Sequence, residues 1–456
     1  MGLLLPRPRE SRFLLGKVLA GCALILCSVW YAQTHFYRDP GSRFFDRRRA
    51  YEQKYSRHRA SEVQSFVGQL ANVSAAVTRP APDEQAGGAQ DPGPTLCVTI
   101  PSVRRTHTQY VETTVASALL GLLPPERRDI HLNVFFAHTD PAEHPTWHQP
   151  WVSRAVDAMY TYNLSSAQDG QRLRQLEQQG DFSEKGVLDY AYALEQCHSM
   201  ETPYVAVLED DIMLADGWLI HLLTGLRQLP GAAERRPSLP PLPPPSSSSP
   251  ARDRARAPSP PHKSWLYVRM FNQERSTGWS SIRIGANHEP LIILAIWLTA
   301  APPILLARRR WKAAHLLLDS ASLLVLFVLL IPSYVLLFFQ SGKASLWPPS
   351  RGIADEPFGC CSQIMVFPRE QVLPLVDFLR RKRRGQIDLL LNDRAVEEGL
   401  TRYALYPVMA QHIGLDSARA TAMAEAQAVW SMAYEDLDPE TLHHDHERLV
   451  DEYYRG

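Results

Sequence analysis

The amino-acid sequence predicts an α/β protein in which a mostly parallel sheet has helices on both faces. A two-helix transmembrane hairpin interrupts this fold, and another transmembrane helix precedes it. Two observations lead to this prediction. Short apolar runs of β character alternate with stretches of helical periodicity from residue 95 onward. Apolar segments long enough to cross a bilayer occur once near the N-terminus and twice between residues 291 and 340.

Length and composition exclude several classes of protein. The chain has 456 residues, which is enough for a sizeable core. Lys plus Arg and Asp plus Glu both number 48, so the formal net charge is zero and no nucleic-acid partner is indicated. A hydrophobic content of 45% excludes a wholly disordered chain, and six cysteines are too few for a disulfide scaffold.

Residues 13–33 form the first predicted membrane span. Its single charge, Lys17, lies close enough to one end to reach the interface. No small-residue cleavage site follows, and Trp30 and Tyr31 are typical of an interfacial belt. The segment is therefore interpreted as a signal anchor rather than a cleaved signal peptide.

Residues 291–307 and 321–339 are two further predicted spans, and the connection between them is too short for a folded domain. They are expected to form a helical hairpin, because helices buried in a soluble core rarely stay apolar on every side for this length. The basic hairpin loop favours a cytosolic loop, which places the rest of the α/β domain in the lumen; its charges are Arg308, Arg309, Arg310 and Lys312. The five arginines between positions 38 and 49 argue for the opposite orientation, but they are less concentrated.

A lumenal orientation has consequences for modification. Asn72 and Asn163 each begin an Asn-x-Ser triplet and are glycosylation candidates. The four cysteines outside the first span would face an oxidising compartment and could include one bridge, whose pairing the sequence leaves open.

The changes in composition divide the chain into nine parts. In order, these are a cytosolic tail (1–12), a transmembrane helix (13–33), a lumenal stem (34–94), the first part of the α/β domain (95–229), a disordered Pro/Ser-rich insertion (230–263), a continuation of the α/β domain (264–290), the transmembrane hairpin (291–340), the last part of the α/β domain (341–420) and a C-terminal tail (421–456).

An acidic triplet, Glu209-Asp210-Asp211, directly follows the apolar run 204–208. Open α/β sheets bind ligands at the carboxyl ends of their strands. Strand alternation predicts that Glu209 and Asp211 point one way and Asp210 the other. Two carboxylates side by side repel each other unless a cation lies between them, and Mg²⁺ or Mn²⁺ takes carboxylate and phosphate oxygens together. The triplet thus predicts a metal and nucleotide-diphosphate site; the alternative is an acidic surface turn.

Two residues near the end of the chain are further candidates. His412 follows the predicted strand 403–408 and is either a metal ligand or a structural histidine. Asp388 begins a helical segment and is either a helix cap or a general base acting on an acceptor hydroxyl.

These pieces together resemble the metal-dependent GT-A glycosyltransferases and, more narrowly, the Golgi GPI-anchor N-acetylgalactosamine transferases of the post-GPI-attachment family. The matching stretches are EKGVLDYAYALE (184–195), YVAVLEDD (204–211), LYVRMFNQER (266–275), CCSQIMVFP (360–368) and the block from Asp388 to HIGLDSA (412–418). The resemblance implies a multi-pass Golgi enzyme with a lumenal catalytic domain. It would use Mn²⁺ (or Mg²⁺) in an inverting transfer of GalNAc from UDP-GalNAc to the first mannose of the GPI glycan on GPI-anchored proteins.

The resemblance also implies roles for individual residues. Asp388 would be the catalytic base on the mannose hydroxyl. The metal would be held by Glu209, Asp211 and His412. The donor would be bound by Thr99, Pro101, Arg105, Asp140, Lys185, Glu209 and Asp210.

Glu274 and Arg275 match a Glu-Arg pair of the family and would line the acceptor side. A cysteine that the family has near position 193 occurs here at Cys197, one helical turn later. This leaves open a bridge from Cys197 to Cys360 or Cys361.

Three other functions remain open at this point. The enzyme could use another sugar donor or an N-glycan acceptor, although such an enzyme needs no hairpin. With reversed topology, it could act on a lipid-linked acceptor in the cytosol. A non-catalytic membrane scaffold in GPI-protein trafficking is the third alternative, with the Pro-rich insertion as its binding segment.

Overall fold

The structure is a computed structural model that describes residues 8–72, 93–164, 166–232, 264–273, 288–356, 361–414 and 429–455. The chain forms two compact units. Residues 1–52 and 274–349 make up the membrane unit, and residues 53–273 and 350–456 make up the α/β unit.

The membrane unit contains three helices that are long and apolar enough to span a bilayer, as predicted. The first is α1 (Pro8–His35) and the second is α11 (Glu289–Arg310). The third is continuous through α13 (Ser320–Leu324), the π-helical η4 (Val325–Leu330) and α14 (Ile331–Gln340). The shorter helices of this unit are α2 (Arg47–Ala50), α12 (Lys312–Leu317) and α15 (Lys343–Leu346).

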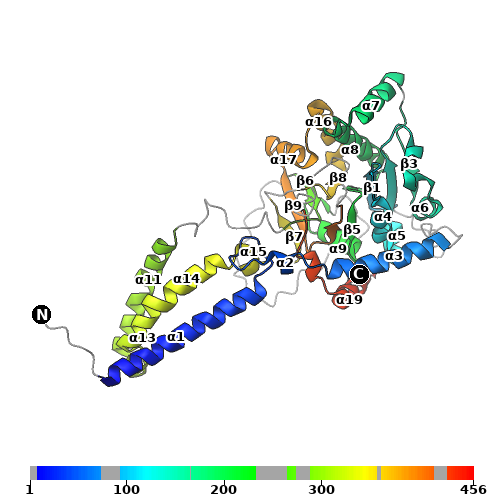
Figure 1. The fold of residues 1–456 in the computed structure, drawn as a ribbon. Helices are drawn as coiled ribbons and strands as arrows, with labels where there is room; N and C mark the ends of the chain where they lie inside the picture. The colour runs from blue at the N-terminus through cyan, green and yellow to red at the C-terminus, as the bar shows by residue number, and fades with distance from the viewer. Residues whose placement is uncertain are drawn as a thin grey trace. The chain divides into compact units, whose positions relative to one another are not determined.

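The helix α1 packs against the third span (Figure 1). Polar side-chain contacts and a close approach at a glycine stabilise this packing. Lys17 Nζ lies 2.6 Å from both carboxylate oxygens of Asp319 and donates to Ser322 Oγ at 2.9 Å. A β-carbon at Gly21 would lie 3.1 Å from the side chain of Val325, so the two helices approach closely there. Lys17, which was expected to reach the interface, is paired with Asp319.

The α/β unit is built on an eight-stranded sheet in the order β3-β2-β1-β4-β8-β6-β9-β7. Its strands are β1 (Leu96–Ser102), β2 (Ile130–Phe136), β3 (Ala158–Tyr160), β4 (Tyr204–Leu208), β6 (Trp265–Arg269), β7 (Gly352–Asp355), β8 (Ile364–Pro368) and β9 (Thr401–Tyr406). The pairs β3–β2, β2–β1, β1–β4 and β6–β9 are parallel, whereas β8 runs antiparallel to β4 and β6, and β7 runs antiparallel to β9. A separate antiparallel pair joins β5 (Ile212–Leu214) to β10 (Ala410–His412).

Helices bury both faces of this sheet, which confirms the predicted fold class. On β4, Val205 and Val207 contribute to one apolar core and Ala206 and Leu208 to the other, as strand alternation requires. The first core is covered by α8 (Phe182–His198), α16 (Arg369–Lys382) and α17 (Ile387–Glu397) (Figure 1). The second lies under α3 (Tyr55–Asn72), α4 (Val111–Leu119), α6 (Pro150–Ala155), α9 (Trp218–Leu226) and α19 (Pro439–Arg455).

The helix α3 corrects the expectation that residues 34–94 form only a stem. Tyr55, Arg59, Val63 and Leu70 are buried on the α/β unit. Arg59 donates to the backbone oxygens of Leu214 and Leu120, at 3.0 and 2.8 Å. The α/β unit therefore begins before residue 55 rather than at 95.

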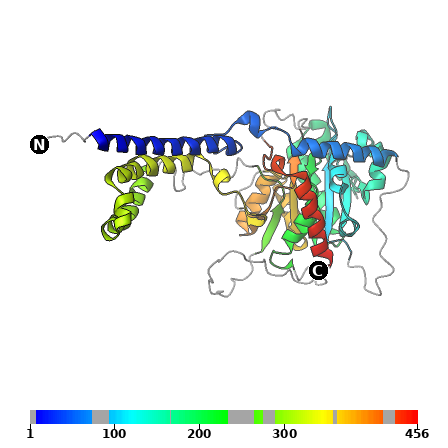
Figure 2. The same cartoon turned by 90° about the horizontal axis from the view of Figure 1, so that it is seen from below.

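The helix α19 likewise corrects the expectation of a C-terminal tail. Leu442, His446, Val450 and Tyr453 recur at helical spacing and form its buried stripe. Figure 2 shows this helix, in red, lying along the α/β unit. The predicted insertion at 230–263 lies almost entirely outside the described residues.

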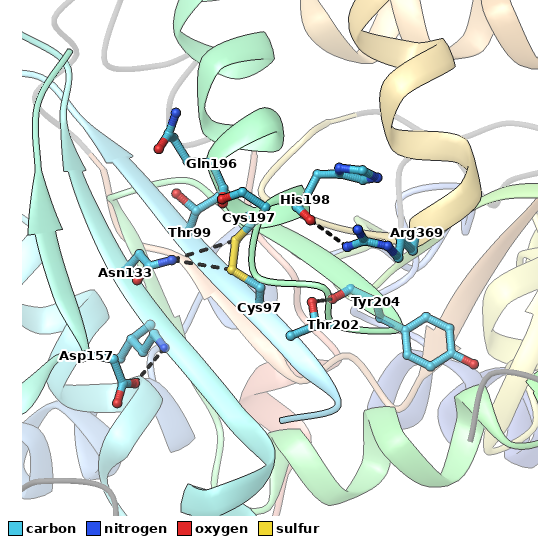
Figure 3. Close-up of a disulfide and its surroundings, with 12 residues drawn as sticks. Cys97, Thr99, Asn133, Asp157, Gln196, Cys197, His198, Thr202, Tyr204 and Arg369 are labelled. Carbon is cyan, nitrogen blue, oxygen red and sulfur yellow. Dashed lines mark hydrogen bonds between the residues drawn. A yellow bond between two sulfur atoms is a disulfide. The ribbon is translucent and has the colours of Figure 1, made fainter. Parts of the chain in front are cut away.

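The structure also corrects the expected pairing of Cys197. Cys97 of β1 and Cys197 of α8 form a disulfide, with 5.5 Å between their Cα atoms (Figure 3). Asn133 Nδ2 donates to Cys97 Sγ at 3.3 Å. The bridge forms because the side chain of Cys97 points to the face of the sheet that α8 covers. Cys361 is disulfide-bonded as well, and Cys360 lies outside the described residues.

The remaining helices connect these elements. They are α5 (Pro124–Asp129), η1 (Pro141–Glu143), η2 (Pro145–His148), α7 (Ala167–Gln179) and η5 (Tyr434–Asp436).

Candidate functional site

The acidic triplet forms a turn between β4 and β5 rather than an extension of β4. Strand alternation therefore does not apply, and the predicted side-chain directions are wrong. Asp210 Oδ1 and Asp211 Oδ2 accept hydrogen bonds from the same Arg105 nitrogen, at 2.5 and 2.9 Å. Glu209 instead accepts a hydrogen bond from Ser362 Oγ at 2.7 Å. The three carboxylates thus face two different neighbours.

Arg105 offsets the repulsion between two carboxylates that are themselves buried. Its side chain is only 9% exposed, and both aspartates are similarly enclosed. Burial raises the pKa of Asp210, and Arg105 opposes that effect. For Asp211, burial also opposes ionisation, but His412 and Arg105 outweigh it and lower the pKa to about 2. Asp211 is thus held as a carboxylate.

His412 lies beside Asp211, as predicted from the sequence. It ends β10, which pairs with β5 so that His412 is opposite Ile212. Its Nε2 atom is 3.4 Å from Asp211 Oδ2. The backbone N–H of Ile413 donates to the Asp211 carbonyl at 2.8 Å. Burial opposes charge on the His412 ring, but the hydrogen bond and charge of Asp211 raise its pKa.

Asp388 is joined to the acidic triplet through two intervening residues. Its Oδ2 atom accepts a hydrogen bond from the backbone N–H of Cys361 at 3.2 Å. The next residue, Ser362, contacts Glu209. The N-cap of α17 is Gln386, so Asp388 is not the helix cap that the alternative reading proposed. Its side chain remains partly exposed.

A buried hydrogen-bond chain, which was not predicted from the sequence, orients Asp210. Ser102 Oγ donates to Asp210 Oδ2 at 2.6 Å and lies 3.1 Å from His144 Nε2. The Thr146 N–H donates to His144 Nδ1, so Nε2 carries the ring proton and points at Ser102. Burial lowers the pKa of His144 to about 4, which keeps the ring neutral. Ser102 could have been found from its place at the end of β1, whereas His144 has no sequence signal.

Several other residues that were predicted to bind the sugar nucleotide have partners within the protein. Thr99 Oγ1 lies 3.0 Å from the Tyr160 hydroxyl. Asp140 is exposed and caps η1. Lys185 is buried, and its Nζ atom donates to Ala137 O, Tyr162 OH and Asp189 Oδ2. Pro101 lies within β1, opposite Phe135 of β2.

Other candidates lie at the edge of what the structure describes. Glu274 and Arg275 fall outside the described residues. Asn72 and Asn163 are exposed, which suits glycosylation acceptors.

A cavity of about 510 Å³ lies at the opposite end of β4 from the triplet, next to Pro203 and Arg369.

Asp211 has an oxygen available for a ligand. Its Oδ1 atom is buried and has no hydrogen-bond partner among the described residues. A buried carboxylate oxygen without a partner is costly, so a cation at this oxygen would offset the loss of hydration. Two carboxylates and an imidazole, from Glu209, Asp211 and His412, form a donor set that suits Mn²⁺. The types of ligand atom present suit a divalent metal, but those of Glu209, Asp211 and His412 are not all gathered within 4.8 Å of one another in the described structure.

A comparison with protein families relates the sequence that forms this site to known proteins. The model of the family described as "GPI-N-acetylgalactosamine transferase PGAP4" matches residues 96–411, more than half of the chain. The match begins at β1, includes the acidic triplet, the two hairpin spans and Asp388, and ends one residue before His412. A comparison with curated proteins finds no match. The chain therefore belongs to the PGAP4 family of GPI-N-acetylgalactosamine transferases.

Proposed function

We propose that this glycosyltransferase is a metal-dependent, inverting enzyme of the Golgi lumen. It would transfer GalNAc from UDP-GalNAc to the first mannose of the glycan on GPI-anchored proteins. The observation that carries the proposal is the unpartnered Oδ1 of Asp211, in a carboxylate whose other oxygen is bound by Arg105 and His412. Family membership supports the GPI acceptor.

Three side chains would hold the metal: Asp211, Glu209 and His412. When bound, Mn²⁺ would neutralise the charge that develops on the departing diphosphate. Arg105 holds Asp211 by Oδ2, which leaves Oδ1 for the metal, and His412 would exchange its contact with Oδ2 for the metal. Asp210, fixed by Ser102 and Arg105, would orient the donor.

Asp388 would act on the acceptor. In an inverting transfer, a base takes the proton of the attacking hydroxyl as the new glycosidic bond forms and the diphosphate leaves. One oxygen of Asp388 accepts the Cys361 N–H, which orients the carboxylate, and the side chain is partly exposed. Both features suit a base that must meet a substrate hydroxyl.

The three membrane helices suit a lipid-anchored acceptor. A GPI anchor keeps its acyl chains in the bilayer, so an enzyme held in the same bilayer searches two dimensions and loses less translational freedom on binding. The cluster Arg308–Arg310 at the end of α11 supports a cytosolic hairpin loop and hence a lumenal α/β unit.

The direct test measures transfer by the full chain, purified in detergent, from radiolabelled UDP-GalNAc to a GPI-anchored acceptor. We expect chelation to abolish transfer and Mn²⁺ to restore it. Asp211→Asn should lower the rate by about 100-fold or more, because charge stabilisation in the transition state is lost. Transfer that survives both chelation and Asp211→Asn would overturn the metal-dependent site.

Two variants of α17 separate the base from the metal site. Asp388→Asn should abolish transfer while keeping Mn²⁺-dependent binding of UDP-GalNAc. Asp393→Asn, on the same helix but exposed, is the matched control and should behave as wild type.

Parallel reactions with UDP-GlcNAc and UDP-Gal test which sugar nucleotide is the donor. Mass spectrometry of GPI glycans from cells with and without the protein tests the acceptor and the scaffold alternative.

A further inference from the structure

A second group of potential metal ligands lies at the far end of β5 from the acidic triplet. It combines Asp216, in the turn before α9, with His443 and His446 of α19. One carboxylate oxygen of Asp216 is 3.0 Å from the Nδ1 atom of His443, and the other is 3.0 Å from Nδ1 of His446. One ligand atom from each of the three residues lies within 4.8 Å of the others.

A fourth residue completes the environment of His446. Glu126 Oε2 is 2.7 Å from His446 Nε2, on the opposite side of the ring from Asp216. Glu126 is fully buried, and its Oε1 atom has no hydrogen-bond partner among the described residues. A ligating histidine usually donates its other ring N–H to a carboxylate, which fixes the ring orientation and tautomer. Glu126 occupies that place.

The backbone around these side chains is shaped to bring them together. Gly121 has φ +94°, and a β-carbon there would lie 2.6 Å from Asp216 Oδ1. Gly217 has φ +67°, and a β-carbon there would lie 3.0 Å from His446 Cβ. Both positions therefore require glycine for conformation and for space. Segments from three distant parts of the chain meet at this point.

The negative charge buried at this place requires a compensating positive charge. Glu126 and Asp216 are two carboxylates with little exposure, and His446 between them is 1% exposed. Buried carboxylates are stable only when a positive charge or a metal compensates them. Two imidazole nitrogens and one carboxylate oxygen, with a fourth position left for water, form a ligand set typical of zinc.

We propose that Asp216, His443 and His446 bind one Zn²⁺ ion and that Glu126 positions His446 for it. This site is independent of the sugar-transfer site, because none of its four residues belongs to that machinery. It would fasten α19 to the turn that follows β5. The other end of β5 adjoins Asp211, so the zinc would brace the strand next to the acidic triplet.

The test compares metal binding by the full chain, purified in detergent through a tag without histidine. The informative variant is His443→Ala, because this side chain is 66% exposed and its removal leaves no core cavity. His444→Ala, the exposed neighbour on α19, is the matched control. After chelation and dialysis against Zn²⁺, bound zinc is measured by mass spectrometry. Co²⁺ absorption spectra report tetrahedral coordination.

We expect wild type and His444→Ala to bind one more zinc ion per chain than His443→Ala, whose affinity should fall more than about 10-fold. Zinc should also raise the melting temperature of wild type and His444→Ala but not of His443→Ala. The acidic triplet is intact in all three proteins, so their difference reports only the second site. Equal zinc binding by His443→Ala and wild type would overturn the proposal. So would wild-type protein that binds no zinc, since a proton on His446 would then be the compensating charge.

Discussion

Gly414 packs directly against the carboxylate of Asp211. A β-carbon at position 414 would lie 2.0 Å from Asp211 Oδ2 and 2.6 Å from its Cγ atom. The two residues before Gly414 also contact Asp211, through the N–H of Ile413 and the ring of His412. The His-Ile-Gly segment therefore fixes the position of the carboxylate by contact on three sides.

Gly414→Ala should displace Asp211 without removing any charged group. A shift of about 1 Å in a catalytic group costs on the order of 100-fold in rate, so we expect a loss of that size in transfer and a higher Mn²⁺ requirement. Gly68→Ala, in α3 with open space around the position, is the control and should leave activity unchanged. Normal Mn²⁺ dependence in Gly414→Ala would show that this contact does not position Asp211.

His144 acts on Asp210 only through Ser102, so it is a positioning residue. His144→Phe keeps a ring in contact with Phe136 but removes the donor to Ser102. Loss of such a supporting hydrogen bond typically costs about 10–100-fold in activity. We expect the loss mainly as a raised KM for the sugar nucleotide.

His144→Gln, which keeps an N–H donor, should recover part of the activity. A purely structural role predicts the reverse order, with phenylalanine tolerated better than glutamine because the site is buried beside Phe136. Melting temperatures of both variants, measured beside the kinetics, separate the two explanations.

The sequence predicted the buried strands well because their environment is uniform. The strand β4 lies at the expected residues, 204–208, since both of its faces are covered and apolar residues run without a break. The short strands β3, β5 and β10 have three residues each, too few for a periodic signal. The pairing of β10 with β5, which places His412 beside Asp211, is therefore known only from the structure.

Side-chain direction at the site was less predictable than proximity. The sequence indicated that the triplet follows a strand, but whether residues 209–211 continue the strand or turn depends on tertiary contacts. Thr114 Oγ1 lies 2.8 Å from the carbonyl oxygens of both Asp210 and Ile212, and this contact from α4 holds the turn. The amphipathic helices α3 and α19 lie in segments predicted as a stem and a tail, because the sequence of a largely polar helix does not show which surface its apolar face packs against.

The Cys97–Cys197 bridge closes a separation of 100 residues. Replacing both cysteines by alanine should lower the free energy of unfolding by about 2–5 kcal/mol, because the unfolded chain regains the freedom that the bridge removes. Peptide mapping without reduction should recover the two cysteines in one linked species. The control is the double alanine variant of Cys22 and Cys27, which are free thiols in α1. The bridge would be contradicted if a reducing agent left the melting temperature unchanged and the two peptides were recovered unlinked.

The buried His144 and the half-buried His221 make the α/β unit sensitive to mild acid. Burial lowers the pKa of His221 to about 4, as it does for His144, whereas an unfolded chain has a histidine pKa near 6.5. Between pH 6.5 and 4 the unfolded state therefore binds protons that the folded state does not. Stability should fall as the pH drops through this window, by up to about 1.4 kcal/mol per pH unit for each such group.

His221 isolates this effect because its Nε2 atom is buried without a hydrogen-bond partner among the described residues. His221→Phe removes the titrating group at little cost in hydrogen bonding, so its melting temperature should fall less steeply than that of wild type between pH 6.5 and 4.5. His148→Ala, at an exposed position, should keep the wild-type slope. Parallel curves for His221→Phe and wild type would mean that His221 titrates normally in the folded protein.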